Sequence, residues 1–328
     1  MDTTATTVPH DHAVNFYDRD GDLLAAVVGY AASALSLGER LVVIATGPHR
    51  LALDAALVDL GVDPHRARAT GWYVALDAAE TLETFMVDGS PDAGRFTASV
   101  GGVVAAAGAD GSTVRAFGEM VALLWDSGNV TAAIELEALW NDLGQHHEFS
   151  LLCGYPVAAL DQAHLTDISR VCDLHSAVVA PLSYESPPPL TREQAGGERS
   201  VVFVPVPGAV PAVRRFVVDL LEAWGESDLV ADAALVTSEL ATNAVRHGDS
   251  AFRASVSRGP GLVRIAIEDV GPGRPVRRVA TPHDSGGRGV AIVETLAHRS
   301  GCDGAAGGKT VWAELRATSG TTGYRGFS

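Results

Sequence analysis

The sequence SELATNAVRHG, Ser238–Gly248, carries the pattern from which the C-terminal part of the chain is best understood. Apolar spacing predicts a helix over about 229–247, and within it Glu239 and Asn243 lie four residues apart. Side chains four residues apart on a helix share a face, so this carboxylate and this carboxamide should lie together. Another side of the helix carries apolar residues suited to a core: Val236, Leu240 and Ala244. Taken alone, the polar face is most simply a solvated one.

Three segments downstream give this helix a second interpretation. EDVGPG ends an apolar strand and contains Asp269, Gly271 and Gly273, where two glycines allow a sharp turn and a close approach to a ligand. SGGRGVAIVE begins a helix whose N–H groups and dipole suit a phosphate chain. Its glycines are Gly286, Gly287 and Gly289. GGKTVWAEL brings Lys309 and Thr310 into the last strand. Four such elements in this order are much stronger evidence for a ligand site than one glycine cluster, because loops are often rich in glycine.

The sequence around these segments predicts an α+β sandwich, with two or three helices on one face of a mixed sheet. VVFVPVP is a strand interrupted by prolines and is therefore expected at an edge. The following helix has an apolar stripe and should end at Gly225. The stripe consists of Val213, Phe216, Val217, Leu220, Leu221 and Trp224. Two strands, AFRASVSR and LVRIAIEDV, are joined by the short turn GPG.

In the N-terminal region short apolar strands alternate with helices. The strands are AVNFY, LVVIAT, GWYVALD, STVRAFGEM and FSLLCGY. This alternation predicts a parallel sheet covered by helices on both faces. SPPPLTREQAGGERS, Ser186–Ser200, has the composition of a linker. We therefore predict an α/β domain over 10–180, a linker over 181–200, the α+β domain over 201–316 and a polar tail over 317–328.

Composition limits the functions open to this chain. Its 328 residues are 47% apolar and 20% charged, which predicts folded domains and not extended disorder. The net charge of −16 makes a poor surface for nucleic acid. We find no signal peptide and no run of about 18 apolar residues, so we expect no membrane-spanning helix. The cysteines Cys153, Cys172 and Cys302 are expected to be reduced and buried in a cytoplasmic protein.

The order of the C-terminal motifs resembles the GHKL ATPase superfamily, which includes gyrase, heat-shock chaperone, histidine kinase and MutL ATPases. SELATNAVRHG and the short loop before GRGVAIVE are most similar to the anti-sigma factor serine kinases. The resemblance covers about 201–316 and implies a Bergerat fold that uses ATP and Mg2+. By this likeness Asn243 is the magnesium ligand and Glu239 is the general base toward a serine hydroxyl or water. Asp269 would accept a hydrogen bond from the adenine amino group, which GTP lacks.

The same resemblance implies further nucleotide contacts. The adenine pocket and the phosphate cap would be lined by glycines: Gly271, Gly273, Gly287 and Gly289. Thr310 stands where the family has a threonine near the adenine. Lys309 replaces the glycine that usually precedes this threonine, and this departure leaves the Thr310 contact open.

The N-terminal region is similar to the MEDS sensory domain, a methanogen/methylotroph family related to RecA-like folds. The likeness covers about 10–180 and rests on HDHAVNFY, LDAAETLETFMVDG and the segment from RAFGEMVALLW to FSLLCGYP. It implies that the domain senses a small molecule. VVIATGPHR stands where a P-loop would be, but it has no Lys-Ser/Thr pair, so we expect no ATP hydrolysis in this domain.

The sequence also suggests where such a small molecule would bind. Ligands of open α/β sheets bind outside the carboxyl ends of the strands. Asp77 and Glu119 each follow a predicted strand, and we expect His12 to approach them. Structural capping is the alternative role for these three residues. His10 and His12 have a spacing found in some metal sites, but the sequence shows no partner cluster.

The two resemblances together predict a cytoplasmic signalling regulator, an anti-sigma-type serine/threonine kinase that uses ATP and is controlled by the sensory domain. The implied partners are a STAS-type anti-sigma-factor antagonist, a sigma factor, or both, with no nucleic acid and no membrane; homodimerisation stays open. One alternative is an ATP-binding protein that sequesters its partner without phosphotransfer. The other is a histidine kinase-like sensor. His175 lacks the sequence context of a phosphoacceptor and is expected to be a surface or half-buried histidine.

Overall fold

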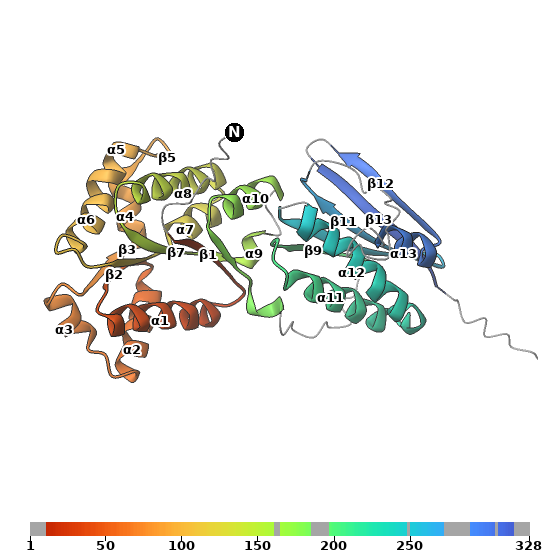
Figure 1. Cartoon of the computed structure of the whole chain (residues 1–328), viewed down its shortest axis with the longest axis horizontal. Coiled ribbons are helices and arrows are strands. Elements are labelled where there is room, and N and C mark those ends of the chain that lie inside the picture. Colours follow the sequence, from red (N-terminus) through yellow and green to blue (C-terminus); the bar gives the residue numbers. More distant parts are fainter. Residues whose placement is uncertain are drawn as a thin grey trace, which may run out of the picture. The chain divides into compact units, whose positions relative to one another are not determined.

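The computed structural model describes residues 11–160, 165–184, 197–247, 250–271, 289–305 and 308–317. The chain forms two compact units, Met1–Leu182 and Ser183–Ser328. Each unit contains one main sheet with helices packed against it (Figure 1).

The sheet of the N-terminal unit has six strands in the order β3-β2-β6-β7-β1-β8, and every neighbouring pair is parallel. The strands are β1 (His12–Tyr17), β2 (Arg40–Ala45), β3 (Tyr73–Asp77), β6 (Val114–Gly118), β7 (Phe149–Pro156) and β8 (Ala177–Val179). The parallel sheet and five of its strands confirm the prediction. The sixth strand, β8, has only three residues, AVV, which is too short to show a pattern.

Helices cover both faces of this sheet, as predicted. They are α1 (Asp20–Leu37), α2 (Gly47–Asp59), α3 (Pro64–Ala69), α4 (Ala78–Phe85), α5 (Ala93–Phe96), the π-helical turn η1 (Thr97–Gly101), α6 (Gly102–Ala107), α7 (Met120–Asp126), α8 (Val130–Gly144), α9 (Val157–Leu160) and α10 (Leu165–Asp173), with a small hairpin of β4 (Met86–Val87) and β5 (Ser90–Pro91). In Figure 1, α1 and α2 lie on one face, and α4, α7 and α8 on the other. Accordingly, all five residues of β2 from Leu41 to Ala45 are buried.

Helix α1 qualifies the expectation that no segment could cross a membrane. Its 18 residues have a mean hydropathy of 1.2, so by length and composition it passes the test for a membrane-spanning helix. The search for an uninterrupted apolar run excludes this segment, because Asp20 and Asp22 interrupt it. The mean hydropathy tolerates both residues. In this unit α1 packs one face on the core: Leu23, Val27 and Ala31 are buried among residues of β2 and α2.

The C-terminal unit has a five-stranded sheet in the order β12-β13-β11-β10-β9. Its strands are β9 (Glu198–Phe203), β10 (Phe252–Gly259), β11 (Leu262–Asp269), β12 (Arg299–Ala305) and β13 (Gly308–Arg316). All four strand pairs are antiparallel, so the expectation of a mixed sheet was wrong. Strand β12 was not predicted, because RSGCDGA has no alternation of apolar and polar residues. Strand β9 lies at an edge, as its prolines predicted.

Three helices cover one face of this sheet (Figure 1). They are α11 (Ala209–Trp224), α12 (Val230–His247), preceded by the 3-10 turn η3 (Ser227–Leu229), and α13 (Gly289–Leu296). The predicted stripe of α11 is confirmed at Val213, Val217 and Leu220, which are buried. The helix ends at Gly225, whose φ of 77° is the left-handed conformation that favours glycine. An antiparallel sheet with helices on one face confirms the predicted α+β sandwich and is consistent with a GHKL-type ATPase.

The C-terminal unit begins before β9, inside the segment predicted as a linker. Tyr184, in the 3-10 turn η2 (Leu182–Tyr184), accepts a hydrogen bond from the Val204 N–H at its hydroxyl, over 2.8 Å. Its ring lies 5.3 Å from that of Phe203, and its carbonyl accepts a hydrogen bond from Arg215. The fourth residue of the predicted linker, Tyr184, is therefore packed on the C-terminal unit.

Candidate functional site

Glu239 and Asn243 lie one turn apart on α12, and both side chains are half-buried. The core face of the same helix is formed by Val236, Leu240 and Ala244, all buried. A merely solvated face would leave the acid and the amide fully exposed. Both side chains are instead partly withdrawn from solvent.

The first residue of α13, Gly289, lies against the carboxylate of Glu239. A Cβ atom at position 289 would collide with Oε2 of Glu239 and would lie 3.3 Å from its Cδ. A side chain at position 289 would therefore push the carboxylate away from the start of α13. The N-terminus of a helix also favours a negative charge. The structure thus brings together two of the residues that the sequence assigned to one site.

Substituting Gly289→Ala is expected to lower any activity that depends on the position of Glu239. The added methyl group displaces only the flexible end of that side chain, so the fold should tolerate it. A misplacement of roughly 1 Å can cost on the order of 100-fold in rate. The phosphotransfer rate and the melting temperature measure the two effects. Gly304→Ala is the matched control, because nothing lies within 4 Å of a Cβ there; equal rates for both variants would contradict the placement.

Asp269 ends β11 and is almost completely buried, with 2% of its surface exposed. Its Oδ1 accepts two hydrogen bonds, from Nζ of Lys309 over 2.7 Å and from the N–H of Gly271 over 2.9 Å. Lys309 also donates to the Gly271 carbonyl over 3.1 Å. A Cβ at Gly308 would collide with the Asp269 carbonyl oxygen, so glycine is needed there as well. The turn after β11 therefore holds a buried carboxylate that is already paired with Lys309.

The structure places Lys309, and not Thr310, beside Asp269. In the β11–β13 register Asp269 faces Lys309, whereas Thr310 faces Glu268. Successive side chains of a strand point to opposite faces of the sheet, so Thr310 points away from the face that carries Asp269. The assignment of Thr310 to the adenine site is therefore not supported. Of the other assigned glycines, Gly273, Gly286 and Gly287 lie outside the described residues.

In the N-terminal unit Asp77 and Glu119 lie at the carboxyl ends of β3 and β6, as predicted. Glu119 is buried; its Oε2 accepts a hydrogen bond from the Thr46 N–H over 2.8 Å, and its Oε1 lies 2.5 Å from Nδ1 of His49. Asp77 caps α4. The backbone N–H of Glu80, and then the guanidinium of Arg50, hold the pKa of Asp77 below its ordinary value.

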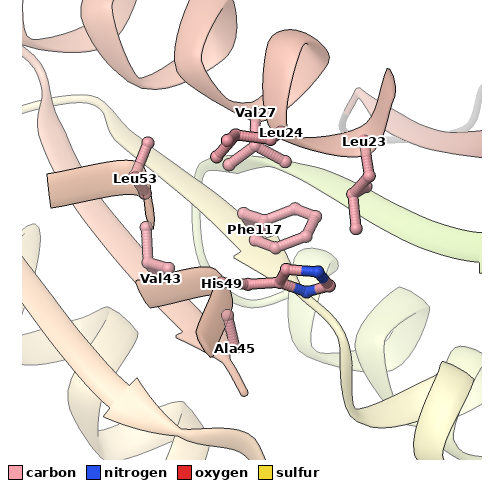
Figure 2. A pocket seen from close by; sticks show the side chains of 8 residues that line it. All are labelled: Leu23, Leu24, Val27, Val43, Ala45, His49, Leu53 and Phe117. Atoms are coloured by element: carbon pink, nitrogen blue, oxygen red, sulfur yellow. The ribbon is translucent and has the colours of Figure 1, made fainter. Parts of the chain in front are cut away.

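Next to His49 there is a small apolar pocket (Figure 2). It is lined by Leu23, Leu24, Val27, Val43, Ala45, His49, Leu53 and Phe117. Its volume of about 10 Å³ has room for a single water molecule. This pocket is therefore too small for an organic ligand, and among the described residues the visible contacts of Asp77 and Glu119 are structural.

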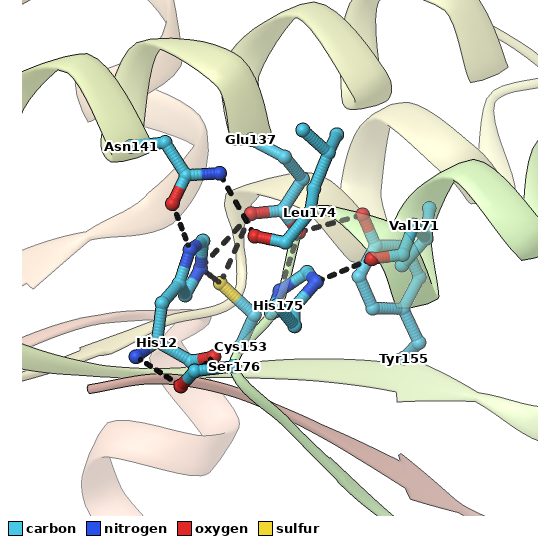
Figure 3. A network of polar contacts seen from close by, with 9 residues as sticks. All are labelled: His12, Glu137, Asn141, Cys153, Tyr155, Val171, Leu174, His175 and Ser176. Carbon is cyan, nitrogen blue, oxygen red and sulfur yellow. Dashed lines mark hydrogen bonds and ion pairs between the residues drawn. The ribbon is translucent and has the colours of Figure 1, made fainter. Parts of the chain in front are cut away.

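His12 does not approach Asp77 and Glu119, contrary to expectation. It begins β1 level with Leu151 of β7, which in turn pairs with Ala116, three residues before Glu119. Its ring is fully buried and points to a different cluster. That cluster contains Glu137, Cys153 and His175 (Figure 3).

His175 is buried, so the expectation of a surface or half-buried histidine was wrong. A phosphoacceptor must be reached by the ATP site of a kinase, and a buried imidazole is poorly placed for that role. The sequence signal that was missed is Glu137, a carboxylate among the buried residues of α8. The neighbours of Glu137 on that face include Ala133 and Trp140. A lone charge on a core face indicates a buried partner.

Two protein families match the chain. Residues 11–172 match the MEDS family, described as MEthanogen/methylotroph, DcmR Sensory domain. Residues 203–315 match the histidine kinase-like ATPase domain. Both matches fall within the domain ranges predicted from the sequence. The chain therefore contains a sensory domain of the MEDS type, followed by a kinase-like ATPase domain.

Among solved structures, the crystal structure of the RsbU and RsbW domains of a Mycobacterium tuberculosis protein is similar at 24% sequence identity, with a TM-score of 0.29. The similarity covers 37% of this chain and 32% of that one. The match thus spans about a third of that structure's length. No curated protein matches the chain.

Proposed function

We propose that this chain, which joins a MEDS sensory domain to a histidine kinase-like ATPase domain, is a cytoplasmic regulator in which a small molecule controls an ATP-dependent protein kinase. The kinase phosphorylates a serine or threonine of a partner protein, in the manner of the anti-sigma factor kinases. That partner is a STAS-type anti-sigma-factor antagonist, and a sigma factor is the second class of partner. The net charge of −16 disfavours nucleic acid as a direct target.

The observation that carries this proposal is the carboxylate of Glu239 at the start of α13, one helical turn from Asn243. The start of α13 is suited to a phosphate chain, which would pass close to Gly289 because that residue has no side chain. Asn243 would hold Mg2+ through its carboxamide oxygen. Bound there, Mg2+ neutralises negative charge on the phosphate oxygens. The residues present therefore fit the phosphate end of Mg-ATP.

Glu239 is placed to act as the proton acceptor. In phosphoryl transfer to a protein, the attacking serine or threonine hydroxyl loses a proton as its oxygen bonds to phosphorus. A carboxylate within hydrogen-bond reach of that hydroxyl accepts the proton. The half-buried position of Glu239 keeps its side chain beside Gly289 while leaving part of it accessible.

Asp269 supports recognition of adenine, with one change from the family pattern. A buried carboxylate can accept a hydrogen bond from the amino group of adenine, and GTP has no donor at that position. Here Lys309 and the Gly271 N–H already donate to Oδ1. Adenine would therefore contact the other carboxylate oxygen or displace the Lys309 ammonium group.

Incubating the full chain with radiolabelled ATP, Mg2+ and candidate STAS-type proteins tests the proposal. We expect label on a serine or threonine of one such protein, with ATP preferred over GTP. A stable complex with the partner that forms with ATP but transfers no label would identify the sequestering alternative. Label on a histidine of this chain would identify the histidine kinase-like alternative. If calorimetry with Mg2+ shows no uptake of nucleotide, both the kinase and the sequestering proposal fail.

A further inference from the structure

Four chemically reactive side chains meet inside the sensory domain, although they come from different parts of the chain. His12 begins β1, Glu137 lies on α8, Cys153 lies on β7 and His175 precedes β8 (Figure 3). One ligand atom from each lies within 4.8 Å of all the others. The side chains of His12, Glu137 and His175 are fully buried, and Cys153 has no exposed surface. Such residues are rarely buried together without a common partner.

The distances in the cluster are those of a tetrahedral metal site. Nε2 of His12 lies 3.3 Å from Oε2 of Glu137 and 3.4 Å from Sγ of Cys153, which is itself 3.4 Å from Oε2 of Glu137. Nε2 of His175 lies 3.5 Å from Oε1 of Glu137. Zinc bonds to nitrogen, oxygen and sulfur are about 2.0–2.3 Å long, so tetrahedral ligand atoms lie roughly 3.3–3.6 Å apart. All four ligand atoms lie within 4.8 Å of one another, so closing them on one ion would require movements of up to roughly 1 Å.

The second nitrogen of each imidazole is already held by an acceptor oxygen. Nδ1 of His12 lies 3.0 Å from Oδ1 of Asn141, whose Nδ2 donates to the Leu174 carbonyl over 2.8 Å. Nδ1 of His175 lies 2.6 Å from the Val171 carbonyl. These contacts place the proton on Nδ1 of each neutral ring and direct the Nε2 lone pair into the cluster, as in metal sites.

The imidazole of His175 provides a second, independent observation that points to a ligand. Its Nε2 is buried and has no hydrogen-bond partner within the part of the chain that the structure describes. A buried polar nitrogen without a partner costs free energy and calls for an explanation. The lone pair of this nitrogen faces Glu137, and an acid oxygen and a ring nitrogen attract only if a proton or a cation lies between them.

The charges of the cluster suit a dication. A bound metal ion deprotonates a coordinating thiol. One thiolate and one carboxylate then balance two positive charges inside the core.

We propose that His12, Glu137, Cys153 and His175 form a binding site for one divalent transition metal ion with the preferences of zinc. Two imidazoles, a thiolate and a carboxylate are zinc ligands, whereas Mg2+ and Ca2+ take oxygen ligands. Binding releases the thiol proton of Cys153 to solvent. Four protein ligands complete a tetrahedral shell, so the ion is structural or sensory and not catalytic.

In the chain, the site also lies next to the last strand of the sensory domain. Ser176, next to His175, exchanges hydrogen bonds with the backbone of His12: its N–H donates to the His12 carbonyl over 2.7 Å, and its Oγ accepts from the His12 N–H over 3.0 Å. Strand β8 follows directly and leads into the connection to the ATPase domain. A metal ion would therefore anchor the last strand of the sensory domain to α8 and β7.

Cobalt binding to the nucleotide-free full chain, stripped beforehand with a chelator, tests the proposal. We expect one Co2+ per chain, visible d–d bands with the intensity of tetrahedral coordination, a sulfur-to-cobalt charge-transfer band, and displacement of cobalt by zinc. Cys153→Ser should lose the charge-transfer band. Asn141→Ala should weaken zinc binding about 10- to 100-fold, because it removes only the support of His12. His175→Gln, which removes a ligand, should weaken it at least as much.

Cys172→Ser is the matched control, because Cys172 is a second buried thiol of the same domain and should leave the cobalt spectrum unchanged. Should Cys153→Ser fail to fold, the double variant Cys172→Ser/Cys302→Ser still decides the question, since Cys153 is then the sole cysteine of the chain. Its charge-transfer band is expected to persist. A folded wild-type chain that takes up no stoichiometric Co2+ or Zn2+ would overturn the proposal. So would a charge-transfer band that survives in Cys153→Ser.

Discussion

Glu239→Gln is expected to lower phosphotransfer by about 10²- to 10⁴-fold, the range that a general base contributes. Glutamine has the shape of glutamate and can keep its place beside Gly289, but it cannot accept the proton of an attacking hydroxyl. Nucleotide affinity should change little, because the proton acceptor is needed only for transfer. Initial rates with radiolabelled ATP and calorimetry on the same preparation separate the two effects.

Two further variants complete this test, one for nucleotide binding and one as a control for the change in charge. Asn243→Ala should abolish ATP binding itself, since it removes the proposed magnesium ligand one turn away on α12. Glu222→Gln, at an exposed position near the end of α11, changes charge equally and should leave both readouts unchanged. Full phosphotransfer by Glu239→Gln would show that this carboxylate is not the base. The close approach of α13 to Glu239 would then serve only the packing of the fold.

Lys309→Met should destabilise the C-terminal unit by about 3–5 kcal/mol, the cost of removing one partner from a buried ion pair. The pair joins Nζ of Lys309 to Oδ1 of Asp269 over 2.7 Å, and both side chains are largely buried. Methionine preserves the length and apolar character of the side chain, so the lost stability measures the cost of leaving the Asp269 carboxylate without its partner. Hydrogen exchange of β11 and β13 in the full chain measures the free energy of opening of this unit alone.

Arg253→Met is the matched control for Lys309→Met. Arg253 lies on β10 and pairs with Glu268 over 3.8 Å, but its side chain is only half-buried and that of Glu268 is exposed. Such surface pairs contribute about 0–1 kcal/mol. If the two substitutions changed protection in β11 and β13 equally, the Lys309–Asp269 contact would not be a buried ion pair in solution.

Elements with a strong local pattern were predictable. The stripe of α11 and its end at Gly225 follow from helical periodicity and from the left-handed backbone that glycine allows. The four-residue spacing of Glu239 and Asn243 is enough to place both on one face of α12. Strand β12 was not predictable, because RSGCDGA has no alternation of apolar and polar residues. The antiparallel pairing of the C-terminal sheet was not predictable either, because strand pairing depends on contacts between distant parts of the chain.

The predicted site residues divide in the same way, into those set by local spacing and those set by strand pairing. Thr310 was assigned from the family resemblance, but only the register of β13 on β11 shows that Lys309 faces Asp269. Asp77 and Glu119 were grouped because each follows a strand, and His12 was expected to approach them. His12 instead begins its own strand, and the pairing of β1 with β7 and of β7 with β6 sets it level with Ala116, three residues before Glu119.

By itself, then, the amino-acid sequence determined what acts over a few residues: helix faces, turns at glycines, strand alternation and the division into two domains. Tertiary structure alone decided what acts over many. His12 and Cys153 are 141 residues apart in the chain, yet their Nε2 and Sγ atoms lie 3.4 Å apart. The physical reason is that local periodicity reflects the backbone geometry of a single element. Contacts between elements arise only when their apolar faces pack and carry buried polar groups with them.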